Sequence, residues 1–197
     1  MSRLKRYIVE EEGILSKYLT LIEKECQPYI KAIRGGKGLF ARETSEKSTI
    51  LKKKVRTDRR PLDTSVKIHK WFDRIFEKKF GWKARSNAIF CYGRPADDVA
   101  LYDFLVFPID KFKYVWSPNI FDLYNITASQ PDDYIESNDD VLETYKYTDK
   151  GLKKALVSGN EIMVNCKEVY LVRGHFLQYI DEKLNLKLQG LRRTKIG

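Results

Sequence analysis

The chain has 197 residues, 43% of them hydrophobic and 13% aromatic, which excludes a disordered or fibrous protein. A chain of this length suits one domain, so we expect a single domain over residues 1–197. The formal net charge of +10 favours polyanionic partners, although a basic surface can also serve solubility alone.

No apolar run reaches the roughly 18 residues that cross a bilayer, and the N-terminus lacks the apolar core of a secretion signal. We therefore expect a cytoplasmic protein with no membrane partner. Three widely spaced cysteines and two histidines give no metal-binding spacing. Free thiols and no metal site are the expectation.

In the first part of the chain, apolar residues at helical spacing predict an amphipathic helix over 12–25. The short apolar stretch 29–33 predicts a strand that ends at Arg34, before a glycine-rich turn. Residues 43–60 contain few apolar side chains and end in KKKVRTDRR, which predicts an exposed basic loop or arm.

A second helix is expected to begin after a cap at Asp63, Thr64 or Ser65 and to end at Gly81. Strand and helix then alternate, and Pro95 lies near the start of a short helix. The expected elements are a buried strand at 87–93, a helix at 94–103, a strand at 104–109, an acidic loop at 132–143, a helix at 150–157 capped by Thr148, two strands joined by a turn from Glu161 to Val172, and a last helix at 175–186.

Three separated features occur in a suggestive order: Arg34-Gly35, the aromatic segment SNAIFCYGRPADDVALYDFLVFPI (86–109), and Glu161 at the start of EIMVNCKEVYLV. This order resembles the mono-ADP-ribosyltransferase superfamily. Its members share an early Arg-Gly or His-Gly, a middle strand followed by a small helix with aromatic and small residues, and a late glutamate that opens a strand-turn-strand. The resemblance covers roughly residues 28–172.

The resemblance implies an α+β fold with a split, mainly antiparallel β core flanked by helices, which binds NAD in the cleft between its sheets. The implied activity is transfer of ADP-ribose from NAD to a macromolecular acceptor, either a nucleic acid or a host protein, with release of nicotinamide. Small size and basic charge suit an intracellular effector or toxin, including one made by a phage and acting in the host cytoplasm.

The resemblance assigns catalysis to Glu161 and Arg34. A guanidinium beside Gly35, where the backbone permits close approach, can bind the NAD pyrophosphate by bidentate hydrogen bonds. Cleavage of the glycosidic bond develops positive charge on the ribose, and a carboxylate such as Glu161 stabilises that charge.

Four further residues complete the expected NAD site. Phe90 and Tyr102 match the aromatic positions that frame nicotinamide, for which stacking contributes on the order of 1 kcal/mol. Ser86 matches the first serine of the family's Ser-Thr-Ser signature, which helps to orient the glutamate. Arg59, in the basic stretch, is expected to contact the adenosine phosphates or a nucleic-acid backbone.

Two departures and several alternatives remain at this point. Gly159 stands where arginine-modifying transferases carry Glu or Gln two residues before the catalytic Glu, which argues against arginine as the acceptor. The Ser-Thr-Ser signature of that branch is also missing, because Arg85-Ser86-Asn87 stands in its place. Arg34 also reads as a surface residue, Phe90 and Tyr102 as core, and Glu161 as the start of an edge strand. The alternative function is a non-catalytic nucleic-acid-binding module in which the basic stretches neutralise phosphates and Tyr and Trp stack on bases.

Overall fold

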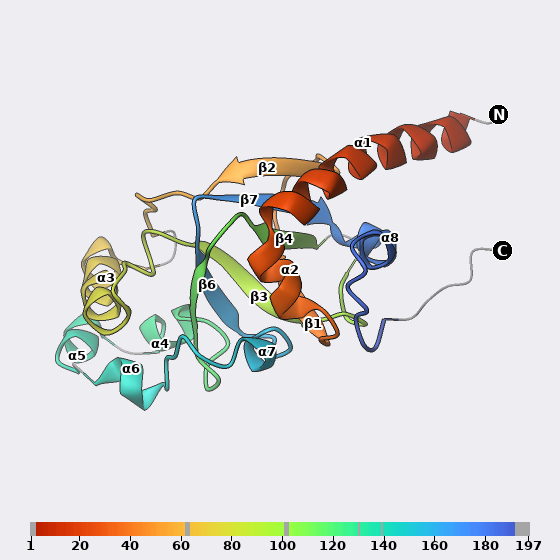
Figure 1. Cartoon of the computed structure of the whole chain (residues 1–197). Helices are drawn as coiled ribbons and strands as arrows, with labels where there is room; N and C mark the ends of the chain where they lie inside the picture. Colours follow the sequence, from red (N-terminus) through yellow and green to blue (C-terminus); the bar gives the residue numbers. More distant parts are fainter. Residues whose placement is uncertain (1–2, 62–63, 101–102, 130, 139, 192–197) are drawn as a thin grey trace.

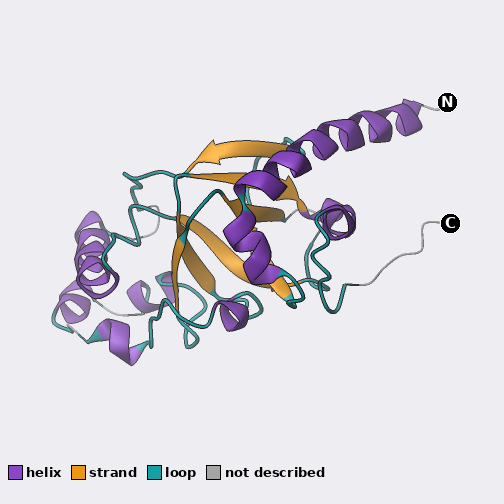
Figure 2. Ribbon diagram, in the orientation of Figure 1, coloured by secondary structure: helices purple, strands orange, loops and turns teal. Residues whose placement is uncertain are grey.

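The computed structural model describes residues 3–61, 64–100, 103–129, 131–138 and 140–191, and over these ranges the fold is α+β (Figures 1 and 2). Seven strands of this part of the chain form one antiparallel sheet in the order β2-β7-β4-β1-β3-β6-β5. The strands are β1 (Gly38–Arg42), β2 (Ile50–Lys54), β3 (Ile89–Pro95), β4 (Phe104–Pro108), β5 (Lys113–Trp116), β6 (Glu161–Asn165) and β7 (Glu168–Arg173). The helices are α1 (Arg3–Glu25), α2 (Gln27–Ile33), α3 (Val66–Phe80), α4 (Tyr124–Thr127), α5 (Asp132–Glu136), α6 (Val141–Thr144), α7 (Leu152–Ala155), η1 (Gly174–Phe176) and α8 (Leu177–Lys183).

The two faces of the sheet pack against different sets of helices (Figure 1). One hydrophobic cluster joins α1, α2 and α8 to the sheet, and the other joins α3 and the short helices α4 to α6 to β3, β5 and β6. Because strand side chains alternate between faces, Ile162 and Val164 of β6 belong to the first cluster and Met163 to the second. This alternation decides which face each functional side chain occupies.

Strands β1 and β4 separate shortly after they meet. Their register holds only two pairs, Ala41 with Leu105 and Arg42 with Phe104. Tyr29 of α2 fills the resulting gap: its ring stacks on Phe40 at 4.8 Å and meets Phe107 edge-on at 5.8 Å. The Tyr29 hydroxyl accepts a 2.7 Å hydrogen bond from the backbone N–H of Phe40, which β4 does not pair.

Several expected elements are present. The side chain of Ser65 accepts a hydrogen bond from the Ile68 N–H and caps α3, and Gly81 ends that helix with a φ of 76°. The strands expected at 87–93 and 104–109 are β3 and β4, and the closing pair is β6 and β7. The last two are joined by a short turn but pair with different neighbours.

The strand expected at 29–33 is wrong, because these residues form α2. Pro28 lies in its first turn, where a missing N–H costs no hydrogen bond, and Arg34 is its C-cap residue. Short apolar runs do not distinguish a strand from a buried helix.

The helix expected at 94–103 is also wrong in the described residues. The chain stays in β3 as far as Pro95, which pairs with Gly38, and then turns. The basic loop expected at 43–60 contains β2, an edge strand that pairs with β7.

Three other boundaries differ. The acidic loop at 132–143 includes α5 and α6, and the helix expected at 150–157 shrinks to α7, with Gly151 rather than Thr148 at its N-cap. The last helix is divided into η1 and α8. None of the described helices combines the length and hydropathy that a bilayer span requires.

Candidate functional site

The register of β3 and β6 gathers aromatic and acidic side chains on one face of the sheet. Glu161 is paired with Tyr92, and Met163 with Phe90. Side chains two residues apart on a strand share a face, so all four lie on the α3 side of the sheet with Met163 in the cluster there. The position of Glu161 at the first residue of β6 brings its carboxylate to the end of that cluster.

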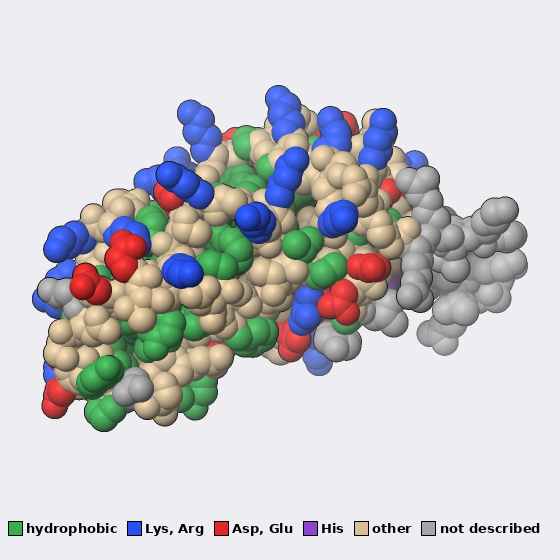
Figure 3. Space-filling view, turned by 90° about the horizontal axis from the view of Figure 1, so that it is seen from below, with side chains coloured by type: hydrophobic (Ala, Val, Ile, Leu, Met, Phe, Trp, Pro, Cys, Tyr) green, Lys and Arg blue, Asp and Glu red, His purple; other side chains and the backbone are tan. Residues whose placement is uncertain are grey.

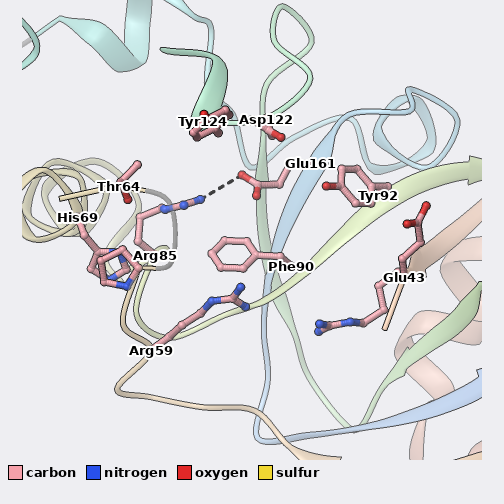
Figure 4. A pocket seen from close by; sticks show the side chains of 12 residues that line it. Glu43, Arg59, Thr64, His69, Arg85, Phe90, Tyr92, Asp122, Tyr124 and Glu161 are labelled. Atoms are coloured by element: carbon pink, nitrogen blue, oxygen red, sulfur yellow. Dashed lines mark hydrogen bonds and ion pairs between the residues drawn. The ribbon is translucent and has the colours of Figure 1, made fainter. Parts of the chain in front are cut away.

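A cavity of about 230 Å³ opens at this point (Figure 4). Its walls come from the end of β1, from β3, from the start of β6, from α3 and the segments before and after it, and from the loop after β5 with the start of α4. The described residues that line it are Arg42, Glu43, Arg59, Pro61, Thr64, His69, Arg85, Phe90, Tyr92, Asp122, Tyr124 and Glu161.

Glu161 is held by an ion pair with Arg85. The Arg85 Nη1 atom donates to Oε1 of Glu161 at 3.1 Å, and the two side chains are only 12% and 14% exposed. Burial raises the pKa of the Glu161 carboxyl above its ordinary value of 4.5, and the nearby Arg85 opposes that rise. A carboxylate that is shielded from water interacts more strongly with charge that develops beside it than a solvent-exposed carboxylate does.

Arg85 is positioned by a buried carboxylate of α3. Asp73 Oδ1 accepts hydrogen bonds from the backbone N–H groups of Arg85 at 2.9 Å and Ser86 at 3.0 Å, and Oδ2 accepts from the Ser86 hydroxyl. His69 Nε2 lies 3.0 Å from the same hydroxyl. Because that hydroxyl donates its proton to Asp73, His69 is a donor to Ser86 rather than a base acting on it. The cluster anchors a turn and is not a hydrolytic triad.

Phe90 lies between two guanidinium groups. The Cζ atom of Arg59 is 4.0 Å from the ring centroid and that of Arg85 is 4.5 Å from it, and Figure 4 shows the two arginines on either side of the ring. Burial lowers the pKa of Arg59 to about 10, and the neighbouring charges of Arg42 and Arg85 add to this effect. A bound anion would relieve this crowding of positive charge.

Two of these arginines have unused hydrogen-bond donors. The Nε atoms of Arg42 and Arg85 are buried and have no hydrogen-bond partner among the described residues. A buried guanidinium N–H without an acceptor is costly. The three guanidinium groups that line the cavity favour a ligand that supplies anionic oxygens.

A pair of stacked aromatic rings, Phe121 and Tyr92, flanks Glu161. The ring of Phe121 stacks on that of Tyr92, with centroids 5.3 Å apart and planes 21° apart, and the Phe121 carbonyl accepts from the Glu161 N–H at 2.6 Å. Phe121 is nevertheless 51% exposed. Burial raises the pKa of Tyr92, and the charges of Glu161 and Asp122 raise it further. Tyr92 is therefore a neutral hydrogen-bonding group at the cavity wall.

The structure brings together three of the expected site residues, Glu161, Phe90 and Arg59, which all line the cavity. Ser86 is hydrogen-bonded to Asp73 and is not among the lining residues. Tyr102 lies outside the described residues.

Arg34 and Gly35 do not join this group. Both are exposed, the Arg34 guanidinium donates to the Leu184 carbonyl at 3.4 Å, and the Gly35 N–H donates to the Leu186 carbonyl. Neither lines the cavity. Their surroundings are the end of α2 and the segment after α8, which follows from the helix that replaces the expected strand.

The sequence reasoning missed Arg42, Arg85, Tyr92 and Asp122. Arg42 ends β1 in the stretch GLFARET, whose apolar residues followed by an arginine are the signal for a strand that delivers a guanidinium to its end. In the sequence, Arg85 stands out only as a departure from the serine signature. No local pattern indicates Asp122, because only the loop after β5 brings it to the cavity.

No group of three or more His, Cys, Asp or Glu side chains in the described part of the chain is arranged to hold a metal ion. Protein-family models, curated proteins and solved structures were each compared with this chain, and none of them matches it.

Proposed function

We propose that this protein cleaves NAD and transfers its ADP-ribose to a macromolecular acceptor, with Glu161 as the catalytic carboxylate. The observation that carries the proposal is the buried Glu161 carboxylate at the start of β6, which faces a cavity lined by three arginines and by three aromatic rings of Phe and Tyr residues. The separation of β1 from β4 supports the split, ADP-ribosyltransferase-like core that the sequence resemblance implies.

In the proposed reaction, the bond between ribose C1′ and the nicotinamide nitrogen breaks, and its electron pair leaves with nicotinamide. Positive charge develops on the ribose, and the Glu161 carboxylate stabilises it. A nucleophile of the acceptor then forms a bond to C1′ and releases its proton. The products are nicotinamide, the ADP-ribosylated acceptor and one proton.

The arginines of the cavity supply the hydrogen-bond donors and the positive charge that bind the NAD diphosphate. Arg42 takes the role that the resemblance implied for Arg34, since it ends a strand at the cavity. The anionic oxygens of the diphosphate would accept hydrogen bonds from the Arg42 guanidinium and offset the crowded positive charge of Arg59.

We assign the nicotinamide to a face of Phe90. Because Arg59 and Arg85 cover this ring in the unliganded protein, one guanidinium must move when the nicotinamide stacks there. The Arg85 guanidinium is paired with Glu161, so Arg59 is the arginine whose side chain moves, toward the diphosphate.

Incubation of the protein with NAD labelled in its nicotinamide tests the proposal. We expect Glu161→Gln to release nicotinamide on the order of 10²- to 10³-fold more slowly than the wild type, by analogy with the loss of other preorganised electrostatic groups. The matched control Glu77→Gln, on the exposed side of α3, should release it at the wild-type rate. Equal release by the wild type and Glu161→Gln would refute the assignment of Glu161.

The second candidate, a non-catalytic nucleic-acid-binding module, is favoured by a basic groove beside the cavity. Thermal unfolding measured with and without NAD distinguishes the two candidate functions. NAD at 100 times its dissociation constant stabilises a protein that binds it by about 2.7 kcal/mol. A pure nucleic-acid binder gives no shift with NAD and releases no nicotinamide.

A further inference from the structure

A second hollow of about 270 Å³ adjoins the candidate active site and has a different character. Six cationic side chains and no acidic ones are found among the described residues that line it, and the remaining lining residues are apolar. The cations are Arg42, Lys53, Lys54, Arg56, Arg59 and Arg60. We call this hollow the basic groove. Arg42 and Arg59 belong to both the groove and the cavity, so the two spaces meet at these side chains.

Two backbone hydrogen bonds hold the chain that forms the groove. After β2, the Val55 N–H donates to the Lys167 carbonyl at 3.0 Å, and four residues later the Arg59 N–H donates to the Ser86 carbonyl at 3.2 Å. These bonds tie the basic segment to the β6–β7 turn on one side and to the Arg85-Ser86 turn on the other. The groove is therefore part of the folded framework rather than a loose arm.

Little of the groove's charge is neutralised. Lys53 pairs with Glu46 at 2.7 Å and Arg56 with Asp58 at 3.7 Å, and both are largely exposed pairs of the kind that contributes little. For Lys54 and Arg60, no ion pair within 4 Å occurs among the described residues. Elsewhere, as on the face drawn in Figure 3, basic and acidic side chains both occur. The groove differs from such surfaces by the lack of acidic residues in its lining.

We infer that the basic groove binds the phosphodiester backbone of a single-stranded nucleic acid, which is the acceptor of ADP-ribose. The inference rests on the proposed function for the acceptor role, whereas the binding itself does not depend on it. The two charges of the NAD diphosphate do not match six cations, but a run of phosphates at regular spacing does.

Two observations favour a single-stranded nucleic acid. Glu161 is only 14% exposed, so among nucleic acids a flexible strand with bases free of a duplex reaches the ribose beside it more easily than a rigid duplex does. Tyr124, on the cavity wall, and Phe121, stacked on Tyr92 beside it, are each 51% exposed. These rings offer stacking surfaces to bases, which an acidic protein segment does not need.

The inference is tested with fluorescein-labelled 12-nucleotide RNA and DNA strands, whose binding is followed by fluorescence anisotropy over a range of salt concentrations. The double variant Lys54→Gln/Arg60→Gln removes two groove cations that do not line the cavity. Lys111→Gln/Lys153→Gln removes the same charge from exposed positions outside the groove and is the matched control.

We expect the groove variant to bind at least one of the two strands about tenfold more weakly than the control. The slope of log K against log salt should fall in magnitude by about 1.4, the value for two lost contacts to a single strand. Nicotinamide release without an oligonucleotide should stay within about twofold of the wild type. With NAD labelled in its ADP-ribose part, the wild type should label the bound strand.

Three results would overturn the inference. The first is equal affinity of the groove variant and the control. The second is displacement of the oligonucleotide by polyglutamate at equal charge concentration, which would indicate an acidic protein partner. The third is transfer of labelled ADP-ribose to protein but to no oligonucleotide, which would leave the proposed function intact. Tight oligonucleotide binding without nicotinamide release overturns the proposed function and the acceptor role, but not the groove as a binding site.

Discussion

The cavity and the basic groove share two arginines but are built on different physical principles. In the cavity, the central ion pair is fixed in a network: Glu161 is paired with Arg85, and the backbone of Arg85 is held by Asp73. In the groove, cations gather without acidic neighbours in the lining. The first arrangement gives geometric precision at one point, as a chemical step requires. The second gives long-range attraction that tolerates imprecise contacts.

Substitution of Arg42 is the strongest test of the difference between the cavity and the basic groove, because Arg42 lines both of them. We expect Arg42→Gln to lower kcat/KM for NAD by about 100-fold, through loss of a guanidinium that binds the diphosphate, and to weaken oligonucleotide binding as well. Steady-state nicotinamide release and anisotropy measure the two effects. Arg74→Gln, on the exposed side of α3, should change neither. A loss confined to only one of the two assays would show that Arg42 does not connect the two spaces.

Salt should affect the function of the basic groove more than that of the cavity, by a factor somewhat smaller than the effect of Arg42→Gln. For four contacts to a single strand, raising the salt concentration from about 50 to 200 mM lowers affinity roughly 50-fold, so labelling of a dilute oligonucleotide should fall by that amount. Nicotinamide release in the absence of oligonucleotide should change less than about threefold, since the ion pair at Glu161 is nearly buried. Parallel assays over the same salt series make the comparison, and equal salt dependence of the two would contradict it.

Asp73 affects the cavity alone. Asp73→Asn replaces charge-assisted hydrogen bonds to the Arg85-Ser86 turn with weaker ones, so we expect nicotinamide release to fall about tenfold and the free energy of unfolding to fall by about 1–3 kcal/mol. Oligonucleotide binding should be unchanged in the folded variant. Because Arg85 opposes the raised pKa of Glu161, a displaced Arg85 should also shift the pH profile, which separates positioning from simple destabilisation.

The pH profile itself should show the smallest effect. Glu161 must be ionised to stabilise positive charge, and its pKa is raised above 4.5, so nicotinamide release should fall as pH drops through a pKa above that value. Arg85→Gln removes a charge that lowers this pKa, and the acid limb of kcat/KM should move to higher pH. A limb that stays in place would exclude Glu161 as the titrating group.

The contribution of Glu161 to stability changes with pH in the direction opposite to its contribution to activity. Its folded-state pKa lies above the unfolded value, so the carboxyl contributes stability that is fully present below about pH 4.5 and is lost as pH rises through the folded pKa. Activity and this stability contribution therefore change in opposite directions over the same pH range. A site that is both dry and charged in its working form is expected to show this conflict.

The sequence predicts the elements with strong local signals. The periodic apolar face of α3, its Ser65 cap and Gly81 are all local features, and the strands around Phe90 and after Glu161 follow from β-forming runs bounded by turns. These are also the elements that deliver Phe90 and Glu161 to the cavity. Their prediction succeeded because short-range chemistry decides them.

The rest of the site depends on contacts between distant segments. The assignment of Arg34 followed from reading 29–33 as a strand, whereas this stretch is a helix whose Tyr29 packs against Phe40 of β1 and Phe107 of β4. Arg85 reaches Glu161 because a carboxylate on α3, twelve residues earlier, holds its backbone. Such arrangements depend on tertiary packing and have no signature in a single sequence.

The insertion of Tyr29 between β1 and β4 has a consequence for the order of folding. Until α2 is in place, the Phe40 N–H has neither the hydroxyl of Tyr29 nor a partner on β4, so the centre of the sheet is incomplete. Although α1 extends beyond the sheet in Figure 1, the helical pair α1–α2 is not a removable appendage. During synthesis this pair leaves the ribosome before the seven described strands, so Tyr29 is available to pack against β1 and β4 when these strands first meet.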